Sequence, residues 1–188
     1  GWSGCGKTTL MNLISGLITP DAGSITVDGR RLDSLPLAER QRFRLRRIGL
    51  VPQNFELLDY LTVEENILLP YRLGVEPRSG ELVSLRCREL ATRAGIGAHL
   101  GRYPDQLSQG ERQRAALCRG LVTSPMILLA DEPTGNLDPD NQDRIVELLL
   151  EEARRLGAVV LMITHDPVLL PRFDRVVDVL ALRKGGRE

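Results

Sequence analysis

The sequence has no net charge and contains few cysteines, and each shortage excludes a class of protein. The 25 lysines and arginines balance the 25 aspartates and glutamates, so the chain lacks the overall basic field of many nucleic-acid-binding proteins. Three cysteines without framework spacing favour a reducing compartment over a secreted disulfide scaffold. No apolar run reaches the roughly 18–20 residues that span a bilayer. A single folded domain remains, because 188 residues with 42% apolar content suffice for a core.

Short apolar segments alternate with amphipathic ones along the chain. The periodicity predicts helices over residues 7–17, 37–47, 61–74, 80–95, 110–122 and 141–157. It predicts strands over residues 24–29, 48–52, 126–132, 158–165 and 174–182. This alternation favours an α/β fold with a mostly parallel sheet flanked by helices. Two adjacent helices between Leu61 and Gly95 break the alternation, so we expect one domain over residues 1–188 with a helical subdomain at about 55–110.

The first eight residues, GWSGCGKT, match the phosphate-loop pattern G-x-x-x-x-G-K-[ST]. Glycines let backbone N–H groups turn toward phosphates, and the helix that follows presents its positive N-terminal end to them. We expect Lys7 to reach the β- and γ-phosphates, Thr8 to bind Mg²⁺ and Thr9 to contact the α-phosphate. The ATP-binding residues predicted here are Gly1, Trp2, Ser3, Gly4, Cys5, Gly6, Lys7, Thr8 and Thr9. The alternative is a glycine-rich turn before an ordinary helix.

A phosphate loop normally connects a buried strand to a helix, and here no strand precedes Gly1. We therefore expect the N-terminal strands of the fold to be missing from this sequence. Without them, neighbouring strands would keep unpaired edges and the phosphate loop would lose its anchor. We expect such a fragment to hydrolyse ATP poorly.

Two acidic residues end the apolar segment MILLADE, and a histidine ends the segment VLMITH. Asp131 stands where phosphate-loop proteins place a carboxylate linked to Mg²⁺. Glu132 could accept the proton of an attacking water. His165 is interpreted as a sensor of the γ-phosphate, because it ends a strand at the same edge of the sheet. The alternatives are two solvated acids and a structural histidine.

The segment LSQGERQRAALCRGLV resembles the signature motif of ABC-type ATPases, usually written LSGGQ. Gln53, in LVPQN, resembles their Q-loop glutamine, GNLD at Gly135–Asp138 resembles their D-loop, and His165 resembles their switch histidine. With the phosphate loop and the acidic strand, these motifs stand in the family's order over nearly the whole chain. The segments NFELLDYLTVEENILLP and LLADEPTGNLD are similar to the subfamily of lipoprotein release, macrolide export and cell division.

The resemblance implies an ATP-hydrolysing subunit that binds ATP and Mg²⁺ and powers a membrane permease. Two such domains close head to tail on two ATP molecules, which implies a second ABC subunit as partner, here a homodimer. Ser108 and Gly110 would hold the γ-phosphate of the other subunit's ATP, although Gln109 and Glu111 depart from the usual residues. Gln53 would touch Mg²⁺ or the attacking water. The implied location is cytoplasmic, peripheral on the inner face of the cell membrane.

Several alternatives stay open at this point. A non-transporting ABC ATPase, acting in mechanotransmission or cell division, differs from a transporter subunit only in its permease partner. A DNA-repair ABC ATPase would carry long coiled-coil insertions, and a nucleotide kinase would lack the signature. Leu57, Leu58, Tyr60 and Leu61 are candidates for a permease groove or for plain core packing. The arginines at 40, 42, 44, 46 and 47 are interpreted as a solvated helix face, and no nucleic-acid partner is expected.

Overall fold

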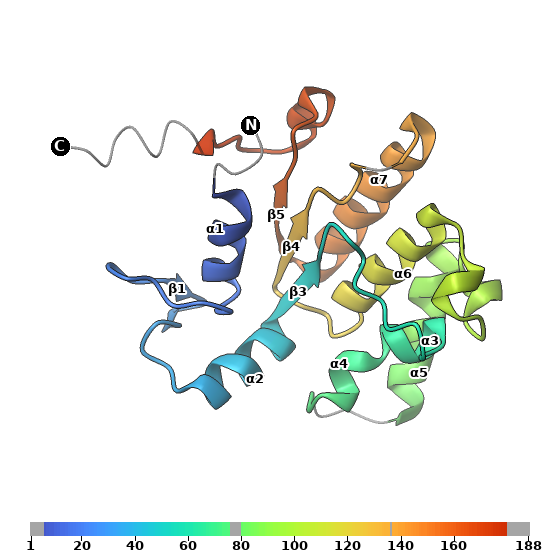
Figure 1. Cartoon of the computed structure of the whole chain (residues 1–188), viewed down its shortest axis with the longest axis horizontal. Coiled ribbons are helices and arrows are strands. Elements are labelled where there is room, and N and C mark those ends of the chain that lie inside the picture. Colours follow the sequence, from blue (N-terminus) through green and yellow to red (C-terminus); the bar gives the residue numbers. More distant parts are fainter. Residues whose placement is uncertain (1–5, 76–79, 136, 180–188) are drawn as a thin grey trace.

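A three-stranded parallel sheet lies at the centre of the computed structural model, which describes residues 6–75, 80–135 and 137–179 (Figure 1). Its strands are β3 (Ile48–Val51), β4 (Ile127–Asp131) and β5 (Val159–Ile163), in the order β3-β4-β5. Each is an apolar run of the length expected for a buried parallel strand. The parallel α/β architecture predicted from the sequence is therefore confirmed, and the carboxyl ends of all three strands share one edge.

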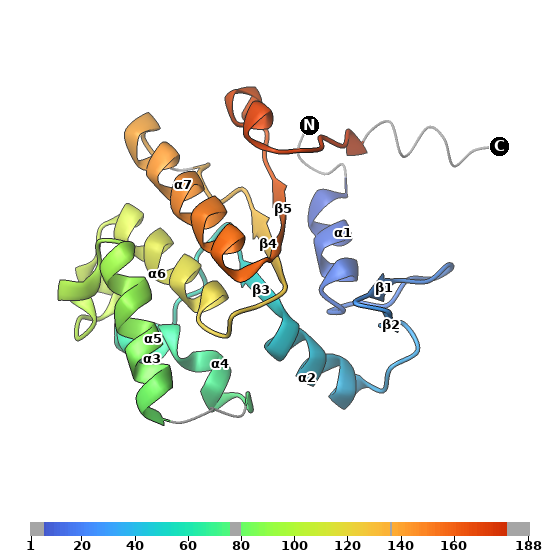
Figure 2. The ribbon, with the colours of Figure 1, turned by 180° about the vertical axis from the view of Figure 1, so that it is seen from behind.

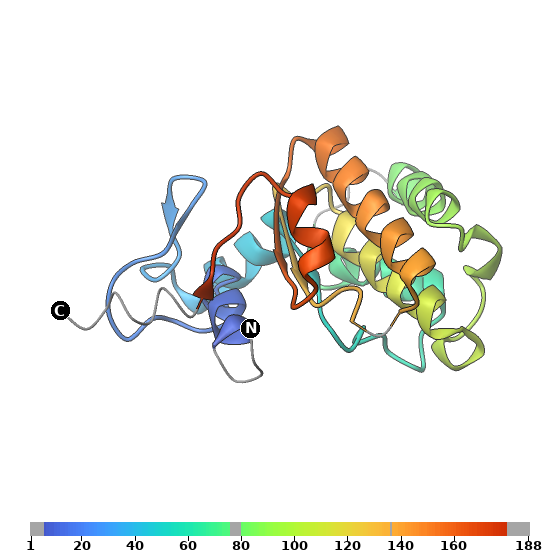
Figure 3. The ribbon, with the colours of Figure 1, turned by 90° about the horizontal axis from the view of Figure 1, so that it is seen from above.

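One face of the sheet is covered by α1 (Lys7–Ile14) and α2 (Leu37–Arg47). Figure 3 shows these helices on the opposite side of the sheet from α6 and α7. Met11 of α1 and Phe43 of α2 pack with Ile48, Leu129 and Ile163 of the strands. The segment expected as a strand over 24–29 forms a small hairpin, β1 (Thr26–Val27) with β2 (Arg30–Arg31). Its two turn residues both have positive φ, as a tight hairpin turn requires.

The other face is covered by α5 (Gly80–Arg93), α6 (Gln109–Leu121) and α7 (Pro139–Leu156), which Figure 2 shows side by side. Leu128 and Ala130 of β4 face this layer, whereas Leu129 faces α1, as the two-residue period of a strand requires. The ends of α7 are fixed locally. Asp138 accepts the N–H of Asn141 at the start, and Gly157 ends the helix with a φ of 63°.

The helix expected over 61–74 is divided into α3 (Val63–Ile67) and α4 (Leu69–Arg72). Pro70 explains the division, because proline has no N–H and its ring would clash with the carbonyl four residues earlier. Buried Asn66 then fixes the preceding loop: its amide donates to Leu58 O, Leu61 O and Thr62 O, each at 3.0 Å. Short 3₁₀ turns complete the described chain: η1 (Gly97–His99), η2 (Pro104–Gln106) and η3 (Pro167–Arg172).

The strand expected over 174–182 does not form in residues 174–179, and the remainder lies outside the described residues. An extended segment becomes a strand only where a neighbour receives its backbone hydrogen bonds. Val176 and Val177 are 56% and 50% exposed, and no described strand pairs with them. Among the described residues, the helices are all too short or too polar to traverse a bilayer.

Candidate active site

The start of α1 is built to receive an anion. Gly6 is the N-cap residue and has a φ of 92°, a left-handed conformation that glycine adopts without strain. It carries no side chain to occupy the first N–H groups of the helix, and no acidic residue lies in the first turn. These N–H groups, with the positive end of the helix dipole, can bind phosphate. The predicted residues Gly1, Trp2, Ser3, Gly4 and Cys5 lie outside the described residues.

Three separated segments place charged and polar side chains together at the carboxyl edge of the sheet. Lys7 Nζ lies 3.2 Å from Glu132 Oε1, and His165 Nδ1 lies 2.6 Å from Glu132 Oε2. Thr8 Oγ1 donates to Asp131 Oδ2 at 3.1 Å. The Glu132 side chain is only 11% exposed, and its carboxylate lies between the Lys7 ammonium and a ring nitrogen of His165. Such an arrangement has the chemistry to bind phosphate and to supply a general base.

The backbone aims the two carboxylates in different directions. Asp131 is the last residue of β4, whereas Glu132 turns out of the strand with a φ of 48°. That conformation is costly for a residue other than glycine and tends to occur at functional positions. Two hydrogen bonds fix it: Glu132 N donates to Ile163 O at 2.9 Å, and Glu132 O accepts from Gly135 N at 3.1 Å.

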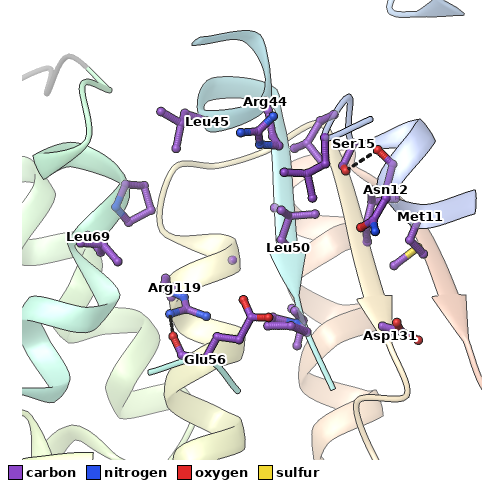
Figure 4. Close-up of a pocket in the computed structure, with 18 of the residues that line it drawn as sticks. Met11, Asn12, Ser15, Arg44, Leu45, Leu50, Glu56, Leu69, Arg119 and Asp131 are labelled. Atoms are coloured by element: carbon purple, nitrogen blue, oxygen red, sulfur yellow. Dashed lines mark hydrogen bonds between the residues drawn. The ribbon is translucent and has the colours of Figure 1, made fainter. Parts of the chain in front are cut away.

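Gln53 shares a cavity with two of these residues. A pocket of about 490 Å³ runs from Thr8 and Asp131 along β3 to α4, and Gln53 lines it where the chain leaves β3. Figure 4 shows Asp131 at one end of this pocket and Leu69 on its far wall. A smaller pocket of about 210 Å³ lies beside Glu132 and His165. The structure thus brings Gln53 and His165 to the predicted phosphate site from opposite sides of β4.

Ser108 and Gly110 are not part of this cluster. They start α6, on the opposite face of the sheet from α1 (Figure 3). Ser108 Oγ accepts the N–H of Glu111 at 3.3 Å, and Glu111 Oε2 accepts the N–H of Ser108 at 2.7 Å, a reciprocal capping box. Ser108 is exposed, and its hydroxyl also interacts with the Glu111 carboxylate. Contact with a second molecule is the geometry that would bring this hydroxyl to a phosphate.

Sequence reasoning missed the cap, although S-x-x-E before a helix is a readable signal. It placed the helix start at residue 110 and treated Glu111 only as a departure from a motif. The hydrogen bond from the Ser108 backbone holds the pKa of the Glu111 carboxyl below its usual value, with a smaller contribution from His99. His99 Nε2 lies 3.2 Å from Glu111 Oε1, so the carboxylate that fixes the signature loop has partners on both sides.

The remaining candidates are placed as follows. Thr9 is exposed on the first turn of α1. Leu57 packs against the core formed with α6, whereas Tyr60 is 74% exposed. None of the candidates Leu57, Leu58, Tyr60 and Leu61 is among the residues that line the 490 Å³ pocket. In the D-loop, Asn136 is outside the described residues, and Asp138 caps α7.

The donor set fits Mg²⁺ better than a metal held by the protein alone. Within the described ranges, no three His, Cys, Asp or Glu side chains are grouped to hold a metal. Mg²⁺ in nucleotide sites instead takes one or two protein oxygens, water and the substrate's phosphates. The Thr8 hydroxyl and the Asp131 carboxylate, 3.1 Å apart beside the N-terminus of α1, supply such oxygens.

Comparison with known proteins gives consistent results. A family model described as "ABC transporter" matches residues 1–135. An uncharacterized ABC transporter ATP-binding protein of Mycobacterium tuberculosis is 43% identical over 188 residues, which are 100% of this chain and 73% of that protein. The lipoprotein-releasing system ATP-binding protein LolD of Cereibacter sphaeroides is 42% identical over 182 residues, 96% of this chain and 80% of LolD.

Solved structures agree with the sequence comparisons. The dimeric structure of MJ0796, a bacterial ABC transporter cassette, superposes with a TM-score of 0.83 at 35% identity, covering 91% of this chain and 75% of that one. A dimeric post-hydrolysis state of the same cassette, bound to ADP and Pi, gives a TM-score of 0.81 at 36% identity, covering 88% and 72%.

Proposed function

The chain belongs to the ABC transporter family of ATP-binding proteins, and we propose that it hydrolyses Mg-ATP between two copies of itself to drive a membrane permease. The observation that carries the catalytic part is the cluster of Lys7, Thr8, Asp131, Glu132 and His165 at one sheet edge. These side chains come from distant parts of the sequence, and each has the chemistry that phosphoryl transfer to water needs. We propose a position on the cytoplasmic face of the membrane, because there the chain can contact the permease and meet cytoplasmic ATP.

In this mechanism the first N–H groups of α1 and the Lys7 ammonium bind and orient the phosphates. Glu132 takes the proton of the attacking water, and its contact with His165 Nδ1 keeps the carboxylate turned toward that water. Mg²⁺, when bound, neutralises charge on the phosphate oxygens. Thr8 and Asp131 are the residues that would hold it. Gln53 lines the same cavity and is placed to orient the water or the ion.

The ion pair between Lys7 and Glu132 has a consequence for nucleotide binding. Lys7 Nζ cannot stay 3.2 Å from a carboxylate and also serve the γ-phosphate fully. The phosphate must compete with Glu132 for the Lys7 ammonium. When phosphate displaces Glu132 from Lys7, the Glu132 carboxylate is released to act on water. Binding and activation of the base are thereby connected through one cation.

Dimer formation supplies the missing half of the phosphate site. Ser108 caps the start of α6 and is exposed, on the opposite face of the sheet from α1. A second copy could present the Ser108 hydroxyl and the N–H groups at Gly110 to the γ-phosphate. The dimeric state of the solved relatives supports this arrangement.

The permease partner is supported by the same 490 Å³ pocket. Away from Asp131, apolar side chains of α2, β3 and α4 line the pocket, and the lining residue Leu73 is 60% exposed. Three charged side chains line it as well: Arg44, Glu56 and Arg119. A cleft between the sheet and the helical segment could receive a short helix of a membrane protein. Because Gln53 lines the same cleft, an occupant there could sense the nucleotide site.

The test is Glu132→Gln in the full-length protein. A general base contributes roughly 10²–10⁴-fold, so ATP turnover should fall by that factor. Mg-ATP binding should be retained or tightened, because the neutral amide no longer competes for Lys7, and an ATP-bound dimer should accumulate. Glu147→Gln, an exposed acid of α7, is the matched control and should keep normal turnover. Near-normal hydrolysis by Glu132→Gln would remove Glu132 from the role of base.

A further inference from the structure

The loop that follows Gln53 has an unusual backbone. Phe55 and Glu56 are consecutive and have φ values of 62° and 50°, in the left-handed region. Single residues visit this region at a cost unless they are glycine, and a bulky aromatic such as phenylalanine does so rarely. The loop is also tightly turned, because Glu56 N donates to Asn54 O at 2.6 Å and Phe55 N donates to Pro52 O at 3.3 Å. Something outside the loop must stabilise this conformation.

Arg119 provides that stabilisation from α6. Its Nη1 donates to Glu56 O and its Nη2 donates to Phe55 O, both at 2.6 Å. Figure 4 shows the contact with Glu56 on the wall of the 490 Å³ pocket. A planar guanidinium grips two neighbouring carbonyls in one geometry, and such charge-assisted bonds are short and strong. Burial lowers the pKa of Arg119, because desolvation disfavours its charged form.

The position of Arg119 joins two parts of the proposed site. α6 begins at Ser108, the residue proposed to contact nucleotide in the second subunit, and carries Arg119 in its last turn. The carbonyls that Arg119 holds follow Gln53 by two and three residues. Gly120, the next residue of α6, lies against β3, where an added Cβ would be 3.0 Å from Leu50 O. A displacement of α6 therefore acts directly on the backbone that carries Gln53.

We propose that Arg119 is a positioning residue that holds the strained loop at Phe55 and Glu56, so that Gln53 stays in the cavity with Thr8 and Asp131 and follows movements of α6. The proposal rests on the proposed roles of Gln53 and Ser108 in ATP hydrolysis. It assigns to Arg119 the connection between the surface that meets a second subunit and the chemistry at the phosphate.

Arg119→Lys tests the proposal, because lysine keeps the charge and the long stem but loses the two-pronged grip. ATP turnover at saturating ATP should fall roughly 10–100-fold, the scale for misplacing a positioned group by about 1 Å. The affinity of the monomer for Mg-ATP should stay within about twofold, since phosphate binding by α1 does not involve Arg119. Arg88→Lys on α5 is the matched control, an exposed arginine exchange expected to leave both quantities unchanged.

Rescue by glycine separates positioning from general damage. Glycine adopts positive φ without a Cβ clash. Replacing both Phe55 and Glu56 by glycine should therefore let the loop keep its turn without the two hydrogen bonds from Arg119. Added to Arg119→Lys, this pair should restore most of the lost turnover. Hydrogen exchange of the amides at residues 54–57 should be faster in Arg119→Lys alone, while the amides of α6 remain protected.

The outcomes are distinguishable. If Arg119→Lys hydrolyses ATP like the parent protein while Glu132→Gln is inactive, the positioning role of Arg119 is wrong and the proposed function stands. If turnover falls but the glycine pair does not restore it, or if α6 loses protection along with the loop, Arg119 is a packing residue and the proposal is overturned. If Glu132→Gln is fully active, the proposed function fails independently of Arg119.

Discussion

The contact between β3 and α6 is so close that one methyl group should disrupt it. A Cβ added to Gly49 would lie 2.1 Å from Gly120 O, 3.0 Å from Gly120 C and 2.8 Å from Leu128 Cδ1. The first two atoms belong to the helix backbone and cannot rotate away. Gly49→Ala should therefore perturb the contact between β3 and α6. Gln53 follows β3, and Ser108 begins α6.

The distances set the size of the effect. An ordinary contact of a Cβ lies beyond about 3.4 Å, so strand and helix must separate by more than about 1 Å at this point. Overpacking a tight core costs typically 1–3 kcal/mol and occasionally more. Both elements are buried, with Leu117 and Leu121 of α6 at 0% exposure, so no free surface is available for relaxation. We expect about 3 kcal/mol of lost stability, a fall in Tm of roughly 6–12 °C for a domain of this size.

Thermal and urea unfolding of Gly49→Ala against the parent protein measure this loss. Gly101→Ala is the matched control, because its φ is not positive and no described atom lies within 4 Å of an added Cβ. It should change stability by less than about 0.5 kcal/mol, as surface substitutions do. Gly120→Ala should fall between the two, with its nearest contact at 3.0 Å. If Gly49→Ala is as stable as Gly101→Ala, the backbone contact is not as tight as the distances state.

Three further predictions concern buried and paired charges. Glu152→Ala should cost about 3–5 kcal/mol in urea unfolding, because it removes the partner of Arg86, which lies 3.2 Å from the carboxylate and whose side chain is only 14% exposed. Unchanged stability would contradict this. Burial raises the pKa of Cys87 to about 12. The neutral buried thiol therefore contributes stability that is fully present below the pKa of an unfolded thiol, near about 8.5, and is lost as pH rises toward 12. Cys87→Ala should therefore lose less stability than the parent between pH 9 and about 11, and parallel curves would refute this assignment. The pKa of Glu111 is lowered chiefly by the hydrogen bond from the Ser108 N–H. The Glu111 carboxylate therefore contributes stability above its unfolded pKa, and this stability is lost as pH falls below about 4. Glu111→Gln should weaken this loss of stability in acid, measured as Tm against pH.

The strands of the sheet could be predicted because their signal is local. The apolar runs expected at 48–52, 126–132 and 158–165 became β3, β4 and β5, with no end shifted by more than two residues. The break at Pro70 was equally local and was missed only because the helical period continued through it. The strand predicted over 174–182 was wrong for residues 174–179 for a different reason. An alternating apolar pattern forms a strand only beside a partner strand, and the partner is determined by the whole fold.

The site could be predicted in its parts but not in its contacts. Motif spacing identified Lys7, Asp131, Glu132 and His165 by type and order. Nothing in a linear sequence indicates that Lys7 would pair with Glu132, 125 positions away, because that distance depends on how α1 meets β4. Arg119 was missed for a related reason, since an arginine in an amphipathic helix is usually solvated, and only the folded loop reveals two carbonyls as its acceptors.

Backbone strain in the described part of the chain is concentrated beside the residues proposed to act on ATP, whose side chains must be held in fixed orientations. In the described part of the chain, five non-glycine residues have positive φ, and three of them, Phe55, Glu56 and Glu132, follow β3 and β4 at the carboxyl edge of the sheet. Each strained position is held by groups from another element: Arg119 of α6 holds the first two, and Ile163 O with the Lys7 and His165 contacts holds the third. A strained loop that depends on outside contacts changes its population when those contacts change. In the proposed cycle, nucleotide would act on Lys7, which contacts Glu132, and a second subunit would act on α6, which carries Arg119. Each ligand would thus reach a strained position through one side chain.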